Sequence, residues 1–459
     1  MEKIRYPYIP NSNSKTKKEM LDKIGVNSVE ELYDFIPRNL RLNRKLNLPE
    51  PYLAEYELKK HVEGVLNKNI SCSDYKNFLG AGCYDHYVPA VCDEISGRSE
   101  FLTAYSGDTY SDHGKSQAIF EFTSLMGELL EMDVVNFPTY DGGQAACTSI
   151  MMAQRITGRK EVLIPRSLSK DILRHINNYC EGMTIITVDY DNNGQLDLSD
   201  LEQKISNDTA CVFIQNPTYF GHLEEHGEEI GKIAHKHDAE FVVYADPSSL
   251  GVVKPPIKYG ADIACGDIQP LGIHMGYGSG LGGYIASQIE EKYVMNYPSH
   301  LYGIFTNEKG EYGFIRSLPD RTSYNRREDG VEFLGTCVGL WAITAAVYLS
   351  VMGPDGMYDL GRNIMYNSNY AKKKIKDVTG AQVLFDNSIS FKEFIVNFDK
   401  FGISVDEINK KLLNYGIFGG FNLSKEHTNL GQSSLYCVTE KTDKADIDNL
   451  VNVLQEILR

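Results

Sequence analysis

The chain has no excess of basic residues and no closely paired cysteines. Its 459 residues carry 46 Lys+Arg against 62 Asp+Glu, which gives a formal net charge of −16. This balance argues against nucleic acid as the main partner, because binding a phosphate backbone needs a basic surface. The nine cysteines include no C-x-x-C pair. We therefore expect free thiols in a reducing compartment and no structural metal site.

Long apolar segments are also scarce. The N-terminal residues lack the continuous apolar core of a secretory signal. Only residues 333–352 form a predominantly apolar run without a charge that is long enough to span a bilayer. The run contains glycine, threonine and serine, and a buried helix of a large α/β protein has the same composition. We interpret it as a core helix and predict a cytoplasmic protein without a membrane partner.

A lysine is missing where the surrounding sequence favours one. Residues 241–246 form an apolar strand that ends in Asp246, and the chain then has Gln269 but no lysine from Tyr259 to Glu291. In pyridoxal-phosphate enzymes, a strand-end carboxylate keeps the pyridine nitrogen protonated and a later lysine forms the Schiff base. The chain therefore has the scaffold for this chemistry without the nucleophile, and we expect it to be inactive alone.

Residues 71–330 alternate between short apolar runs and helical patterns. The apolar runs are 161–164, 184–188, 210–214 and 241–244, and the helical patterns are 116–131, 142–156, 169–179, 197–205 and 228–237. Strands that each lead into a helix form βαβ units, and continuously apolar strands are buried on both faces. The pattern predicts a large α/β domain with a mainly parallel sheet.

Two smaller parts flank this domain. Residues 1–70 are predicted to form a helical arm, with a short helix closed by Gly25 and a capping box from Ser28 to Glu31. Such an arm is either an interaction element or a strap across its own core. Residues 331–459 begin with the long apolar helix, turn at 353–356 and continue as alternating strands and helices. They are predicted to form a small α+β domain.

This plan resembles that of fold-type-I pyridoxal-phosphate enzymes, and several segments resemble the glycine cleavage system P-proteins, which are glycine decarboxylases. The similar segments are 8–10 (YIP), 20–26, 78–90 (FLGAGCYDHYVPA), 117–122 (QAIFEF), 140–143 (YDGG) and 261–269 (ADIACGDIQ). The similarity runs nearly end to end. It is closest to subunit 1, the alpha chain, of the two-subunit bacterial form.

The resemblance implies a division of labour between two subunits. In that family the beta subunit carries the pyridoxal phosphate, and the alpha subunit is similar to it but lacks the cofactor lysine. The two assemble as an α2β2 tetramer that decarboxylates glycine and passes the aminomethyl group to the lipoylated H-protein. Gln269 then falls at the Schiff-base lysine position, which agrees with the chemical argument.

Four further residues belong to a predicted vestigial cofactor cleft. Gly142 and Gly143 open a helix whose N–H groups either cradle a phosphate or are simply a retained helix start. Asp246 either pairs a pyridine nitrogen or, before Pro247, forms a turn; the structural role is the favoured one. His274 lies in the glycine-rich stretch that follows Gln269, where a packing role is the simpler interpretation.

Three residues of one loop are candidates for a contribution to the partner's active site. Tyr84, His86 and Tyr87 lie in the segment that resembles the family most closely. His86 either reaches towards the partner subunit or is a packed histidine, and the residues alone leave both possibilities open.

The chain departs from the family pattern in four segments. These are 106–114, 166–167, 278–280 and 328–333. They fall in predicted cleft or interface loops, so they bear on the substrate and not on the fold. Two alternatives to a glycine decarboxylase subunit therefore stay open: a paralogous subunit of a related enzyme for another amino acid, and a structural or regulatory pseudoenzyme.

Overall fold

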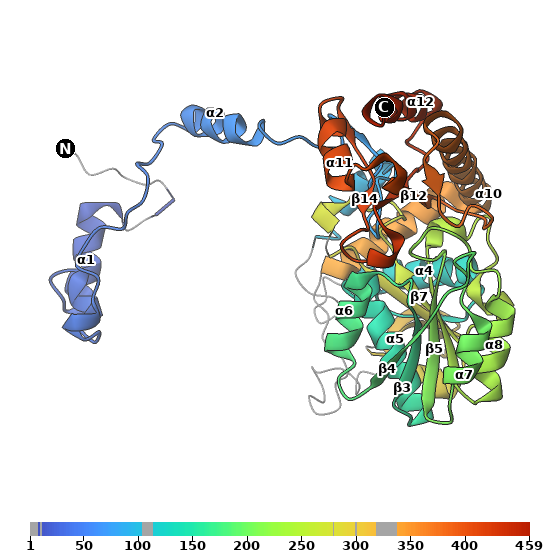
Figure 1. Ribbon diagram of the computed structural model, residues 1–459. Coiled ribbons are helices and arrows are strands. Elements are labelled where there is room, and N and C mark those ends of the chain that lie inside the picture. Colours follow the sequence, from blue (N-terminus) through green and yellow to red (C-terminus); the bar gives the residue numbers. More distant parts are fainter. Residues whose placement is uncertain (1–7, 10–11, 103–112, 279, 299–300, 318–336) are drawn as a thin grey trace. The chain divides into compact units, whose positions relative to one another are not determined.

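The computed structural model describes residues 8–9, 12–102, 113–278, 280–298, 301–317 and 337–459. Contacts divide the chain into two compact units, Met1–Asn69 and Ile70–Arg459. Figure 1 shows the helices and strands of each unit.

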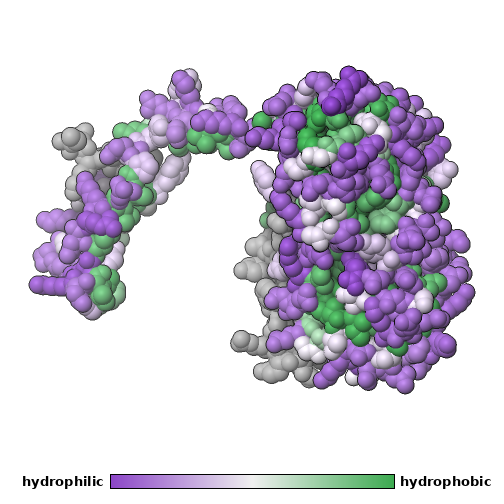
Figure 2. All heavy atoms as spheres, in the orientation of Figure 1, coloured by the Kyte–Doolittle hydropathy of each residue, from purple (hydrophilic) through white to green (hydrophobic). Residues whose placement is uncertain are grey.

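The first unit is helical, and its described residues form no buried core. It contains α1 (Ser14–Ile24), the 3₁₀ helices η2 (Glu30–Tyr33) and η3 (Arg38–Leu40), and α2 (Glu55–Leu66). Gly25 closes α1 in the left-handed conformation (φ 86°), and the predicted capping contact forms between the Glu31 amide and Ser28 Oγ at 3.3 Å. None of the described side chains in this unit is buried, and apolar side chains lie along its surface (Figure 2).

The second unit is built on a seven-stranded sheet. Its strand order is β2-β8-β7-β6-β5-β3-β4. The strands are β2 (Val134–Val135), β3 (Glu161–Pro165), β4 (Thr184–Val188), β5 (Thr209–Asn216), β6 (Glu240–Ala245), β7 (Ile263–Asp267) and β8 (Gly283–Ser287). β4, β3, β5, β6 and β7 are parallel neighbours, whereas β8 is antiparallel to both β7 and β2. The predicted mainly parallel sheet is confirmed.

Helices cover both faces of this sheet, as continuously apolar strands require. Along β5, Cys211 and Phe213 pack into one core and Val212 and Ile214 into the other. The first core is shared with α5 (Gly142–Thr157), α6 (Lys170–Tyr179) and α9 (Glu291–Val294). The second is shared with α4 (His113–Leu130), α7 (Leu198–Lys204), α8 (Gly227–Lys236) and α10 (Cys337–Lys374). A hairpin of β9 (Leu301–Thr306) and β10 (Tyr312–Ser317) follows α9.

A smaller antiparallel sheet forms the C-terminal part. Its order is β11-β12-β15-β14, with bounds Gln382–Val383, Glu393–Asn397, Ser433–Cys437 and Phe421–Asn422. Helices α11 (Val405–Leu413) and α12 (Lys444–Ile457) pack on it around a separate core. Strand β1 (Lys76–Asn77) pairs with β13 (Ile417–Phe418). The start of the segment 71–330 therefore lies with this C-terminal part.

The long helix α10 connects the two sheets. The predicted turn at 353–356 is a kink within this helix, where Gly353 adopts φ 59° and ψ −176° and Pro354 begins the second half. Pro354 lacks an N–H, which a residue at the start of a helical segment does not need. Among the described residues α10 is the one helix long and apolar enough to cross a membrane, and half of its most apolar window is buried. Residues 333–336 of the predicted core helix lie outside the described residues.

Candidate functional site

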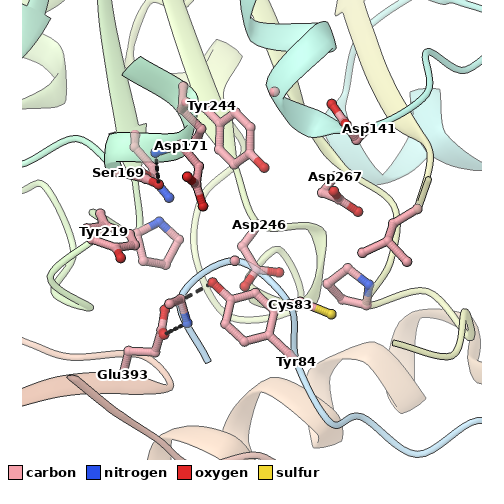
Figure 3. A pocket seen from close by; sticks show the side chains of 18 of the residues that line it. Cys83, Tyr84, Asp141, Ser169, Asp171, Tyr219, Tyr244, Asp246, Asp267 and Glu393 are labelled. Atoms are coloured by element: carbon pink, nitrogen blue, oxygen red, sulfur yellow. Dashed lines mark hydrogen bonds between the residues drawn. The ribbon is translucent and has the colours of Figure 1, made fainter. Parts of the chain in front are cut away.

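A cavity lies where β5, β6 and β7 end, at the carboxyl edge of the large sheet. Open parallel sheets bind ligands at this edge. The cavity has a volume of about 230 Å³ and is lined by residues of the large sheet together with Lys392 and Glu393 of the small one. Five carboxyl groups surround it (Figure 3), contributed by Asp141, Asp171, Asp246, Asp267 and Glu393.

Gln269 lies beside this cavity with both ends of its amide in use. Its oxygen accepts a hydrogen bond from the Tyr84 amide at 3.0 Å. Its nitrogen donates to the carbonyl oxygens of Tyr84 at 2.9 Å and Ile273 at 3.0 Å. The side chain is 1% exposed. Gln269 therefore fastens the loop of residues 80–87 to the cleft, and an amide in this position cannot act as an imine-forming nucleophile.

Asp246 has protein partners at its side chain. It caps the turn after β6 by accepting from the Ser248 amide at 2.9 Å and the Ser248 hydroxyl at 2.7 Å, which fits the predicted turn role. It also pairs with the Lys392 ammonium at 2.5 Å. Burial alone raises a carboxyl pKa, but Lys392 and the Ser248 hydrogen bond bring the pKa of Asp246 below its usual value.

The N-terminus of α5 is also satisfied from within the chain. Asp141 is the N-cap and accepts from the Gln144 amide at 2.8 Å, and Asp267 accepts from the Gly142 amide at 3.2 Å. Packing accounts for the two glycines: a Cβ on Gly142 would lie 2.3 Å from the Tyr244 hydroxyl, and one on Gly143 would lie 2.9 Å from His175 Nδ1. The carboxyl groups of Asp141 and Asp267 therefore accept hydrogen bonds from N–H groups that a phosphate would need as donors.

The loop of residues 80–87 lies across the cavity and is held by the small domain. The Glu393 carboxylate accepts from the Ala81 amide at 2.7 Å and the Tyr84 hydroxyl at 3.0 Å (Figure 3). The Lys392 ammonium lies 3.4 Å from the centre of the Tyr84 ring, a cation–π contact. Burial raises the pKa of Glu393 to about 7 and that of Asp267 to about 7.

His86 points into its own chain. Its side chain lies between Glu440, at 2.8 Å from Nδ1, and Lys392, at 3.1 Å from Nε2. The residue is 5% exposed, whereas Tyr87 is 61% exposed. His274 lies at the surface, where it pairs with Asp93 at 3.0 Å. Of the predicted site residues, Tyr84, Gly143 and Asp246 line the cavity, and Gln269 is hydrogen-bonded to Tyr84. The cavity lining does not include Gly142, His86, Tyr87 or His274.

Lys392 and Glu393 were not identified from the sequence. They come from a strand of the small domain, far along the chain from Asp246. The available signal was the pair of charges within the otherwise apolar segment 391–396, because charged residues are seldom fully buried unless they are paired. Lys292, in contrast to Lys392, does not contact Asp246. It pairs with Glu240, which lies at the opposite end of β6.

The four segments that depart from the family pattern are only partly described. Arg166 forms an ion pair with Asp189, and Gly278 lines the cavity. Residues 106–112, 279 and 328–333 lie outside the described residues.

Comparison with known proteins identifies the family. The family model for the glycine cleavage system P-protein matches residues 6–454. The chain belongs to the glycine cleavage system P-protein family. It is 37% identical to a probable glycine dehydrogenase (decarboxylating) subunit 1 of Staphylothermus marinus, over 99% of this chain and 98% of that protein. It is 36% identical to the protein of the same description from Pyrococcus furiosus, over 98% and 99%.

The solved structures agree with the fold. A glycine decarboxylase P-protein in inhibitor-bound form matches with a TM-score of 0.86 and 29% identity, over 99% of this chain and all of that one. A sphingosine-1-phosphate lyase from Burkholderia pseudomallei matches with a TM-score of 0.64 and 14% identity, over 92% and 94%, which shows the fold alone. The predicted fold-type-I pyridoxal-phosphate architecture and P-protein family are confirmed. The chain is a component of a glycine decarboxylase, and the relatives' designation as subunit 1 implies a second subunit.

The residues at the cavity do not fit pyridoxal phosphate. The chain has an amide at the position predicted for the Schiff-base lysine. Asp246, the predicted partner of a ring nitrogen, is paired with Lys392, and carboxyl groups face the helix N-terminus. Each position that would serve the cofactor already has a partner within the chain.

The role of Gln269 in fastening the loop can be tested by replacing its amide with a carboxylate. Gln269→Glu removes the donor that serves two buried carbonyl oxygens, so we expect a loss of about 2–4 kcal/mol in the free energy of unfolding. Urea denaturation measures this loss. Gln203→Glu on the exposed face of α7 is the matched control and should change stability little. Equal effects of the two substitutions would refute the proposed role.

The raised pKa of Glu393 predicts a pH dependence of stability. The folded chain keeps this proton up to about pH 7, whereas the unfolded chain releases it near the ordinary value of 4.5. The stabilisation is therefore present below about pH 4.5 and is lost as the pH rises through 7.

The comparison of wild type with Glu393→Gln isolates this effect. Relative to the variant, wild type should lose on the order of 2–3 kcal/mol between pH 5 and pH 8, measured by urea denaturation. Glu202→Gln, at an exposed position of α7, should leave the profile unchanged. A constant difference between wild type and Glu393→Gln across this range would contradict the prediction.

Proposed function

We propose that this chain is the noncatalytic subunit of a two-subunit glycine decarboxylase, in which the second subunit carries the pyridoxal phosphate. The observation that carries the proposal is the amide of Gln269, at the position predicted for the Schiff-base lysine, which is hydrogen-bonded through both its oxygen and its nitrogen to the chain's own backbone. In this assignment glycine is decarboxylated at the second subunit, and the aminomethyl group passes to the lipoylated H-protein.

The assembly proposed is an α2β2 tetramer, by resemblance to the family. The helical arm offers a surface for the second subunit. On α2, Leu58, Val62, Val65 and Leu66 lie at a spacing that places them on one face, and they are 42–57% exposed. A segment without a buried side chain cannot offset the entropy of ordering its backbone from its own contacts. We infer that the partner subunit covers this face.

The loop of residues 80–87 provides a second point of contact. Tyr87 is exposed at its end, and its amide is fixed by Glu440 at 2.6 Å. His86 is buried and Tyr84 is half-buried, and both hold the loop in place. We infer that Tyr87 faces the partner's active site, while Tyr84 and His86 contribute to that site indirectly through the loop conformation.

The absence of a cofactor nucleophile can be tested on the purified chain. We expect no visible cofactor band after incubation with pyridoxal phosphate, and no cofactor mass at any single lysine after borohydride treatment and mass spectrometry. Glycine decarboxylation should appear only when the second subunit is added. A stoichiometric adduct at one lysine of this chain, or decarboxylation by the chain alone, would refute the proposal.

The arm surface can be tested with paired charge substitutions in the full-length chain. Leu58→Glu combined with Val62→Glu places two charges on the apolar face of α2 and should weaken assembly with the second subunit at least about tenfold. Size-exclusion chromatography with light scattering measures the assembly. Lys59→Glu combined with Lys60→Glu introduces the same side chains beside that face and should weaken assembly less. Intact assembly of the first variant would exclude this face as the interface.

A further inference from the structure

We propose that Lys392 takes the place of the cofactor's ring cation in this chain: its ammonium neutralises Asp246 and holds the loop of residues 80–87 across the cleft. The inference extends the proposed function, because it identifies a second barrier to cofactor binding besides Gln269. Lys392 is then a positioning residue: it belongs to the small domain and holds groups of the large domain in place.

The first support is the set of partners around the Lys392 ammonium. It lies 2.5 Å from the Asp246 carboxylate, 3.3 Å from the Ser248 hydroxyl and 3.1 Å from His86 Nε2. The residue is 3% exposed, and the Tyr84 ring covers the ammonium at 3.4 Å. A buried ammonium needs both a counter-charge and hydrogen-bond acceptors. Asp246 supplies the counter-charge, and the Ser248 hydroxyl and His86 Nε2 are the acceptors.

The hydrogen bonds also determine which ring nitrogen of His86 carries the proton. A lysine ammonium only donates, so His86 Nε2 must present its lone pair to Lys392. The ring proton then resides on Nδ1, which donates to Glu440 at 2.8 Å. The result is a continuous chain, Asp246–Lys392–His86–Glu440, from the cleft to the exposed Tyr87, whose amide also donates to Glu440 at 2.6 Å.

At the cleft end of this hydrogen-bonded series, the positive and negative charges balance. Asp246 carries one negative charge and Lys392 one positive charge. The protonated ring nitrogen of the cofactor would place one positive charge beside Asp246, as the Lys392 ammonium does. The two cations therefore compete for one carboxylate, and restoring a lysine at position 269 alone does not free it.

The test compares two variants of the full-length chain with pyridoxal phosphate as the probe. Gln269→Lys restores the amine, and Gln269→Lys with Lys392→Ala also frees Asp246. We expect the double variant to bind the cofactor at least about tenfold more tightly than the single variant. Binding is read from cofactor absorbance and from the borohydride-reduced mass at position 269. A double variant that binds no better than the single one, whether both bind or neither does, overturns the proposal.

If the double variant does not fold, a second measurement still tests the proposal. Lys392→Ala leaves Asp246 without a cation, and ethylammonium chloride supplies one. We expect ethylammonium to raise the apparent Tm of Lys392→Ala but not that of wild type or of Asp246→Asn with Lys392→Ala. No rise, or an equal rise in the variant without Asp246, overturns the proposal. Cofactor binding by the wild-type chain is a separate measurement that tests the proposed function alone.

Discussion

The pairing of Asp246 with Lys392 is the contact on which the candidate site depends. Asp246 ends a central strand of the large sheet, and burying its charge without a partner would cost several kcal/mol, on the order of 3–5. Lys392 lies next to the first residue of β12, so this single contact ties the edge of the large sheet to the small domain. Its ammonium also touches Tyr84 and His86. The loop across the cleft is thus fixed by the same charge.

Three groups at the cleft make structural contacts within the chain. Gln269 donates to backbone oxygens, Asp246 holds a lysine, and the helix start at Gly142 donates to Asp267. Each group keeps the position that the fold gives it at the carboxyl edge of the sheet. Because Gln269, Asp246 and the Gly142 amide already have partners within the chain, these three groups need no ligand.

Local sequence signals predicted the helices and strands well. The helix predicted at 142–156 is α5 (Gly142–Thr157), with Asp141 as its cap, and the strand predicted at 241–244 lies within β6. These elements depend on periodicity and caps, which are encoded within a few residues. The turn predicted at 353–356 became a kink, because a single glycine at φ 59° redirects α10 without ending it.

The site was predicted less completely, because its partners are far apart in sequence. Gln269 stood out as an absence beside a recognisable strand end, and Asp246 as that end. Lys392 and Glu393 showed only a pair of charges within an apolar segment, and nothing local indicated that they lie beside Asp246, since β12 belongs to another sheet. The direction of His86 depends on Lys392 and Glu440 together. Sequence therefore identified the large-domain half of the site, and the three-dimensional fold supplied the other half.

The pairing of Asp246 with Lys392 has a consequence for assembly. If a subunit needs its cofactor to complete its core, its stability depends on the concentration of that cofactor. Here the ammonium of Lys392 is covalently part of the chain, so Asp246 is neutralised at any cofactor concentration. In the assembly proposed, only the second subunit would then gain stability from pyridoxal phosphate. This chain could fold first and present its loop and arm surfaces as a preformed partner.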